Sequence, residues 1–273
     1  MIGMAMRPVN QLLFSQKPGM SFGLVRMAGG GGILPRQTAV HTRQWLGMVR
    51  IVCIRTCTGN TRPKAVRCPM TISAAGLIYN PYLALDGQIS ATAHDLTDVF
   101  GEIDSALDKG VGIKKAVMGD RVSAALRSRL AAARVQGFQH AAKYAKSRMP
   151  SLYGRTASDF AKKRAAKVND WMNGTTRRTL KRAPDSEFVL SGDRAVAAAR
   201  YENARAYFKG VKDAYAGGVK PERFRKKWNA AADACDDCLL AEDSGRIGIF
   251  DYFDNMMQFP PGHLSCGCWL VVT

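Results

Sequence analysis

Acidic residues are missing from the first 85 positions of this 273-residue chain, and Asp86 is the first carboxylate. The same stretch holds ten Lys or Arg residues, so it carries +10 of the formal net charge of +18. The remaining 30 basic and 22 acidic residues carry the other +8. Because the excess is so one-sided, the two parts of the chain need separate interpretations.

Long apolar runs are missing too. A bilayer span needs about 18 or more consecutive apolar residues, and the best candidate here, WLGMVRIVCI, is interrupted by Arg50. The first twenty residues also lack the charged start, apolar centre and small-residue cleavage site of a secretory signal. We therefore expect no contact with a membrane and a cytosolic compartment, in which cysteines stay reduced.

Two common catalytic signatures do not occur in the sequence. They are the phosphate-binding G-x-x-x-x-G-K-[ST] loop and the metalloprotease pattern H-E-x-x-H. The nucleophile pattern G-x-S-x-G occurs once, as GMSFG at 19–23, in a stretch that lacks the strand–turn–helix periodicity the motif requires. The run from Gly29 to Gly32 follows no expected strand and opens no helix, so it does not predict a phosphate site. Asp251 and Asp254 could pair as carboxylates, but their segment IFDYFDNMMQF is more typical of an exposed loop. The sequence favours a protein that is not an enzyme.

Residues 1–69 show no sustained helical or strand period. They fit a basic arm that binds nucleic acid, an organelle transit peptide, or translated upstream DNA with the true start at Met70. We favour upstream DNA, because ordinary sequence begins abruptly after Met70. We expect this extension to be disordered or foreign to the native protein, with its three cysteines as incidental thiols (Cys53, Cys57 and Cys68).

Helical periodicity begins at about residue 92. Thr92 and Asp95 form a possible capping box, and apolar residues then recur at helical spacing. Further helices are expected from about Asp120 to Met149, where Pro150 ends the run, from Thr156 to Gly174, and from about Gly192 to Tyr215 behind a Ser191 cap. The fold class is α+β: a helical domain over residues 70–185, followed by a C-terminal domain over residues 186–273 with a small β region.

Lys and Arg are dense between residues 143 and 182, as in KKR at 162–164 and RRTLKR at 177–182. Contact with nucleic acid is one interpretation of this density. Solvated helix faces are the other, and the pattern alone leaves both open.

The C-terminal region contains a C-x2-C-x24-H-x2-C-x-C pattern. Its members are Cys235, Cys238, His263, Cys266 and Cys268. Two thiolates two residues apart can hold one tetrahedral ion, and a returning segment completes the set, so we expect a closed, structural zinc site. If residues 266–270 form a strand, Cys266 and Cys268 face the same side, and we prefer Cys266 as the fourth ligand. Free buried thiols or a disulfide between Cys235 and Cys266 are the alternatives.

Several blocks between residues 155 and 273 resemble phage head morphogenesis proteins, the minor head proteins of the Mu F type. ARYENARAYFKG at 199–210 is similar to the family's A-R-T-E-x-A-R-A-Y-N-x-G helix. Trp228 and Asp233 precede the C-x2-C pair, and PPGHLSCGC at 260–268 is similar to the family's P-P-x-H-P-x-C-R-C ending. The chain departs from the pattern at four positions (Tyr201, Phe208, Leu264 and Gly267). These departures leave the ligands intact and put the roles of Arg200 and Glu202 in doubt, for which we expect an ion-pair network.

The resemblance implies a non-enzymatic, low-copy component of a tailed-phage or prophage head. Its implied partners are the portal protein and capsid or scaffold proteins, with packaged double-stranded DNA as an open point. It implies a location in the host cytoplasm during virion assembly and later in the head interior. A zinc-containing nucleic-acid-binding module or nuclease is the alternative function.

Overall fold

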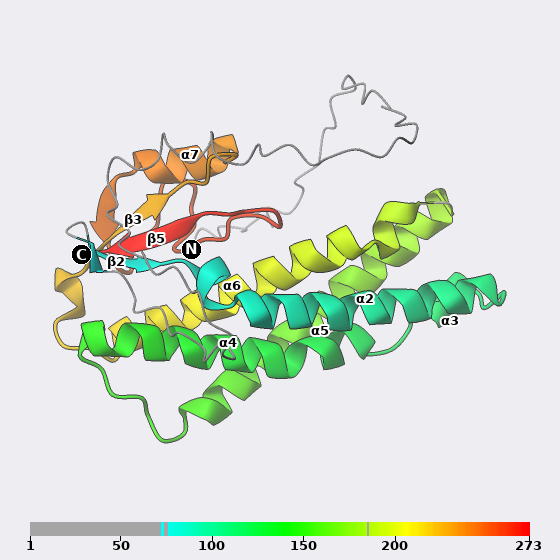
Figure 1. Ribbon diagram of the computed structural model, residues 1–273, viewed down its shortest axis with the longest axis horizontal. Helices are drawn as coiled ribbons and strands as arrows, with labels where there is room; N and C mark the ends of the chain where they lie inside the picture. The colour runs from blue at the N-terminus through cyan, green and yellow to red at the C-terminus, as the bar shows by residue number, and fades with distance from the viewer. Residues whose placement is uncertain (1–71, 74–75, 185) are drawn as a thin grey trace, which may run out of the picture. The chain divides into compact units, whose positions relative to one another are not determined.

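The computed structural model describes residues 72–73, 76–184 and 186–273 (Figure 1). Contacts divide the chain into residues 1–58 and residues 59–273, so every described residue belongs to the second unit. The expectations for residues 1–69, including their origin and their three thiols, lie outside the described residues.

Seven α-helices and two short 3-10 helices account for most of the described residues. They are α1 (Pro81–Ala84), α2 (Asp86–Asp108), α3 (Ile113–Ala116), α4 (Arg121–Ala145), α5 (Tyr153–Arg182), η1 (Glu187–Leu190), α6 (Gly192–Ala216), η2 (Pro221–Arg223) and α7 (Asp236–Asp243). Figure 1 shows the long helices α2, α4, α5 and α6 gathered into one bundle.

A small antiparallel sheet accompanies the bundle, and its strand order is β1-β2-β5-β3-β4. Its strands are β1 (Ile72–Ser73), β2 (Gly76–Tyr79), β3 (Arg225–Asn229), β4 (Arg246–Gly248) and β5 (Trp269–Val272). Leu270 of β5 lies opposite Tyr79 on one side and Trp228 on the other. The last strand of the chain is therefore the middle strand of the sheet. The α+β fold class, with a small C-terminal β region, is confirmed.

Two of the expected helix starts are wrong. α2 begins at Asp86 rather than at Thr92, which lies buried inside the helix with its hydroxyl donating to the Gln88 carbonyl (2.7 Å). α5 begins at Tyr153, and the Thr156 hydroxyl bonds back to the Leu152 carbonyl. In both cases a T-x-x-D pattern falls inside a helix, where threonine satisfies its own hydroxyl locally.

Two of the expected helix ends are also wrong, whereas α6 matches its prediction. α5 continues past Gly174 to Arg182, because its later buried residues Met172, Thr176 and Leu180 keep one face against the bundle. α4 ends at Ala145, before Pro150, with Lys146 in the left-handed conformation. α6 covers Gly192–Ala216, and the Ser191 side chain accepts the N–H of Arg194 as its cap.

α4 and α6 form the tightest pair of helices in the bundle. A Cβ added at Gly137 would lie 2.0 Å from the Tyr207 carbonyl oxygen, and one added at Gly210 would lie 1.9 Å from the Arg134 carbonyl oxygen. Only glycine permits so close an approach of two backbones. The boundary expected at residue 185 thus falls between helices that share one core.

Buried ion pairs connect α6 to its neighbours. Arg134 of α4 binds Asp213 (2.6 Å), which also accepts the Tyr153 hydroxyl (2.8 Å). Glu202, expected in such a network, is buried and pairs with Arg164 of α5 (2.6 Å). Arg200 is not in this pair.

Candidate metal centre

The two halves of the cysteine and histidine pattern come together beside the sheet. Cys235 is the N-cap of α7, and the first turn of that helix brings Cys238 next to it, with the Cys238 N–H donating to the Cys235 carbonyl (2.9 Å). The other three members lie on the returning segment just before β5 (His263, Cys266 and Cys268). A short helix and a loop thus supply all the donor atoms.

Three separations between donor atoms are close to those that one tetrahedral ion requires. His263 Nε2 is 3.2 Å from Cys235 Sγ and 3.4 Å from Cys238 Sγ, and Cys238 Sγ is 3.7 Å from Cys266 Sγ. An ion with bonds of about 2.3 Å to sulfur and about 2.0 Å to nitrogen holds its ligands roughly 3.8 Å (S–S) and 3.5 Å (S–N) apart. The group can therefore hold a metal ion.

Cys238 is the common member of two compact groups of donors. One group joins it to Cys235 and His263, and the other joins it to Cys266 and Cys268. Cys235 is exposed, whereas Cys238, Cys266 and Cys268 are buried. The four thiols are free, so the alternative disulfide between Cys235 and Cys266 is not formed.

The expected strand over residues 266–270 starts three residues later, at Trp269. Cys266 and Cys268 therefore lie in the loop before the strand, yet both are buried and close to Cys238. The Cys266 N–H donates to the His263 carbonyl (3.1 Å), which folds this segment into a turn around the donors.

Hydrogen bonding distinguishes Cys266 from Cys268. The Cys268 thiol donates to Cys266 Sγ, which lowers the pKa of Cys266 and raises that of Cys268. Burial raises the pKa of the Cys238 thiol. The two thiols thus differ in their hydrogen bonding, and both lie within 4.8 Å of Cys238 Sγ as candidate ligands.

Lys226 on β3 fixes the loop that leads to His263, and sequence reasoning missed it. The side chain is fully buried, and its ammonium donates to the Asp251 carbonyl (2.8 Å) and the Gln258 carbonyl (2.7 Å). The rings of Phe253 and Phe259 lie 5.1 and 4.3 Å from Nζ. Burial lowers its pKa to about 7. The sequence RKKWN could have indicated its burial, because alternate residues of a strand point to the same side and Lys226 shares the inward side with Trp228.

Tyr82 of α1 links the ligand loop to the bundle. Its hydroxyl donates to the Cys266 carbonyl, and the Arg200 guanidinium of α6 lies 4.9 Å from the centre of its ring. Desolvation by burial raises the pKa of Tyr82, so the hydroxyl stays protonated as a donor. Arg200 therefore contacts an aromatic ring rather than a carboxylate.

Asp251 and Asp254 are both exposed, in a loop as expected. Asp251 Oδ2 accepts the N–H of Gly248 (2.9 Å), and the N–H of Asp254 donates to the Ser244 hydroxyl (2.9 Å). The Asp251 carboxylate and the Asp254 backbone thus make local turn contacts.

Comparison with family models, with curated proteins and with solved structures found no match for this chain. Among the helices of the described part, none combines the length and the apolar character needed to cross a membrane.

Proposed function

We propose that this chain is a minor head protein of a tailed phage or prophage, which acts without catalysis during capsid assembly at the portal and in the capsid interior. The observation that carries the proposal is the closure of the cysteine and histidine cluster. It joins the C-x2-C pair to the P-P-x-H-x-x-C-x-C ending, the two blocks that resemble the Mu F type family. The ARYENARAYFKG block lies on α6, the helix that packs against α4 in the bundle core.

The proposed ion is zinc, in a structural role. The proposed ligands are Cys235, Cys238, His263 and Cys266, which would supply the Cys3His set that is common in structural zinc sites, and Cys268 lies within 4.8 Å of the Cys238 and Cys266 sulfurs. With four protein ligands the coordination is complete, so no position is left for a reacting water. The residues of this chain then bind and orient the terminal segment, and the ion adds on the order of 10 kcal/mol to its folding.

Elemental analysis of the purified chain tests the zinc site. We expect one equivalent of zinc, which Cys238→Ser abolishes because Cys238 belongs to both donor groups. Cys268→Ser is the matched control, since it removes a neighbouring buried thiol but no proposed ligand, and it should keep the equivalent. Metal-free protein that stays folded would refute the site.

Peptide mass spectrometry of purified phage particles tests the assembly role. We expect peptides from residues 70–273 at low abundance relative to the major capsid protein, together with recovery of the portal protein when this chain is isolated from assembling cells. Absence of the chain from both particles and portal complexes would contradict the role.

The alternative of a zinc-containing nuclease or nucleic-acid-binding module predicts a different result. Purified chain would then cleave plasmid DNA in the presence of Zn²⁺ or Mg²⁺, or bind it without any association with particles. The complete ligand set argues against a metal-dependent nuclease.

A further inference from the structure

Helix α5 exposes basic side chains in two groups, one before residue 168 and one after residue 176. Eight basic side chains on it face solvent, against two carboxylates (Asp159 and Asp170), which leaves a net charge of +6 on the exposed surface of this helix. The basic residues are Arg155, Lys162, Lys163, Lys167, Arg177, Arg178, Lys181 and Arg182. We call these eight residues the α5 basic face.

No member of the α5 basic face forms an ion pair within the described residues, although Asp159 and Asp170 lie on the same helix. The basic residue of α5 that does form one, Arg164, is turned inward to Glu202. Lys114 of α3 lines the same shallow hollow as Arg177, so the positive surface extends beyond α5. Like charges crowded in this way repel one another, and a polyanion relieves the repulsion.

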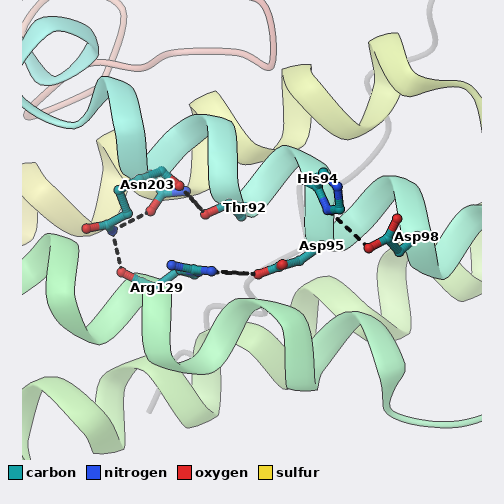
Figure 2. A network of polar contacts seen from close by, with 7 residues as sticks. Thr92, His94, Asp95, Asp98, Arg129 and Asn203 are labelled. Atoms are coloured by element: carbon teal, nitrogen blue, oxygen red, sulfur yellow. Dashed lines mark hydrogen bonds and ion pairs between the residues drawn. The ribbon is translucent and has the colours of Figure 1, made fainter.

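Helix α2 has the opposite charge. It contains six carboxylates and no Lys or Arg, and it packs against α4 and α6. Half of these carboxylates already have a basic partner, as Figure 2 shows for Asp95 with Arg129 (3.2 Å) and Asp98 with His94 (3.1 Å). The third is Glu102, which pairs with Arg121 (3.3 Å).

Two occupants of the α5 basic face can be compared by the negative charge that each offers: a second copy of this chain and double-stranded DNA. A second copy of the chain would offer α2, with three carboxylates outside these ion pairs, or α7, with four, and neither helix alone balances a charge of +6. Double-stranded DNA offers one phosphate charge for about every 1.7 Å of its length. The 30 residues of α5 extend about 45 Å, which exceeds one turn of B-DNA at roughly 34 Å.

We infer that the α5 basic face binds the phosphate backbone of double-stranded DNA without reading its sequence. Lys and Arg contact phosphate oxygens, whereas the acidic α2 surface is repelled and so orients the protein with α5 toward the duplex. The inference adds a DNA partner to the proposed head protein. It rests on the proposed function in one respect only: the packaged genome would be the source of the DNA.

A binding experiment tests the inference. Fluorescence anisotropy measures the affinity of the full chain for a duplex of about 30 base pairs at salt concentrations between about 50 and 200 mM NaCl. The test variant replaces Lys162, Lys163, Lys167 and Lys181 by Gln, which keeps helix propensity nearly unchanged. The matched control removes the same charge from exposed residues elsewhere (Lys109, Lys143, Arg223 and Arg246, each to Gln). Circular dichroism confirms that both variants fold.

We expect the test variant to bind at least about tenfold more weakly at low salt, with a salt dependence shallower by about 0.9 in log–log slope for each lysine that contacts a phosphate. The control should stay within about twofold of the parent chain. Equal losses of affinity in both variants would mean that only the net charge of the chain matters. Unchanged affinity of the test variant would mean that the α5 basic face does not bind DNA. Loss of self-association without loss of DNA binding would assign the face to a second copy. None of these results alters the portal test of the assembly role.

Discussion

Two glycines set the distance between α4 and α6, the helices at the centre of the bundle. Gly137 and Gly210 each face a backbone carbonyl of the opposite helix, and a Cβ at either position would overlap it. A backbone carbonyl cannot move aside as the end of a flexible side chain can. At these two sites glycine is therefore needed for the close packing of the helices and not for an unusual backbone conformation.

Gly210→Ala should therefore destabilise the fold by about 3 kcal/mol, because a methyl group 1.9 Å from the Arg134 carbonyl oxygen forces α4 and α6 apart. Gly174→Ala, where an added Cβ would lie 3.9 Å from its nearest neighbour, Arg178 Nη1, is the control and should stabilise by about 0.5–1 kcal/mol through helix propensity. Urea denaturation measures both changes. Equal effects of the two substitutions would show that the close approach is not needed.

Lys226 is buried without a carboxylate partner in its hydrogen bonds, and its pKa is lowered to about 7 by desolvation. Asp251 acts against this decrease, and Lys212 adds to it. An unfolded lysine titrates near 10.4, so between pH 7 and pH 10 the unfolded chain binds more protons at this residue than the folded chain. Its contribution to the free energy of unfolding therefore rises with pH across that window.

Comparison of the parent chain with Lys226→Met isolates this effect, since all other titrating groups are shared. The stability of the parent relative to the variant should increase by about 2 kcal/mol from pH 7 to pH 9 and stay flat below pH 6. Urea unfolding at several pH values gives the difference. A difference that does not vary with pH would mean that Lys226 titrates normally.

At the scale of elements, the short helix α1 connects the sheet, the bundle and the ligand loop. It directly follows β2, Asn80 caps it through the N–H groups of Tyr82 and Leu83, and α2 begins two residues after its end. The hydroxyl of Tyr82 reaches the Cys266 carbonyl, so a ligand residue is held from a point 184 positions earlier in the sequence.

Tyr82→Phe should release zinc faster to a chelator by several-fold, because one hydrogen bond contributes about 1 kcal/mol to holding the Cys266 segment. Leu83→Ala, on the same helix but 80% exposed, is the control and should leave the rate unchanged. A coloured chelator added to zinc-loaded protein reports the rates. Identical rates for both variants would mean that α1 does not support the loop.

At the scale of the whole described unit, the last strand of the chain is also the middle strand of its sheet. β5 pairs with β2 on one side and with β3 on the other, and the ligand loop ends immediately before it. A metal ion held by this loop would thus act on β5 and, through its pairing, on β2 and β3.

Chelation of the ion should expose the amides of β2 and β5 to hydrogen exchange, while α4 and α6 keep their protection because they pack directly on each other at Gly137 and Gly210 and carry none of the candidate ligands. Mass spectrometry of exchange with and without chelator measures this. Loss of protection throughout the bundle would indicate that the ion supports the entire unit, and no loss in β2 would contradict the coupling.

Local pattern was sufficient for the α+β class, for α6 with its Ser191 cap and for the five candidate ligands, because periodicity, capping and ligand spacing are short-range properties. It was insufficient for the start of α2 and the end of α5, where burial against neighbouring helices outweighs Thr92 and Gly174 as signals.

The sequence by itself thus determined which side chains can bind a metal and the approximate positions of the four long helices. Only the tertiary structure decided that Cys238 is shared by both donor groups, that Lys226 and Tyr82 hold the ligand loop, and that Gly210 faces a carbonyl. These are contacts between residues far apart in the chain. They depend on how helices and strands pack, and a linear pattern does not contain that information.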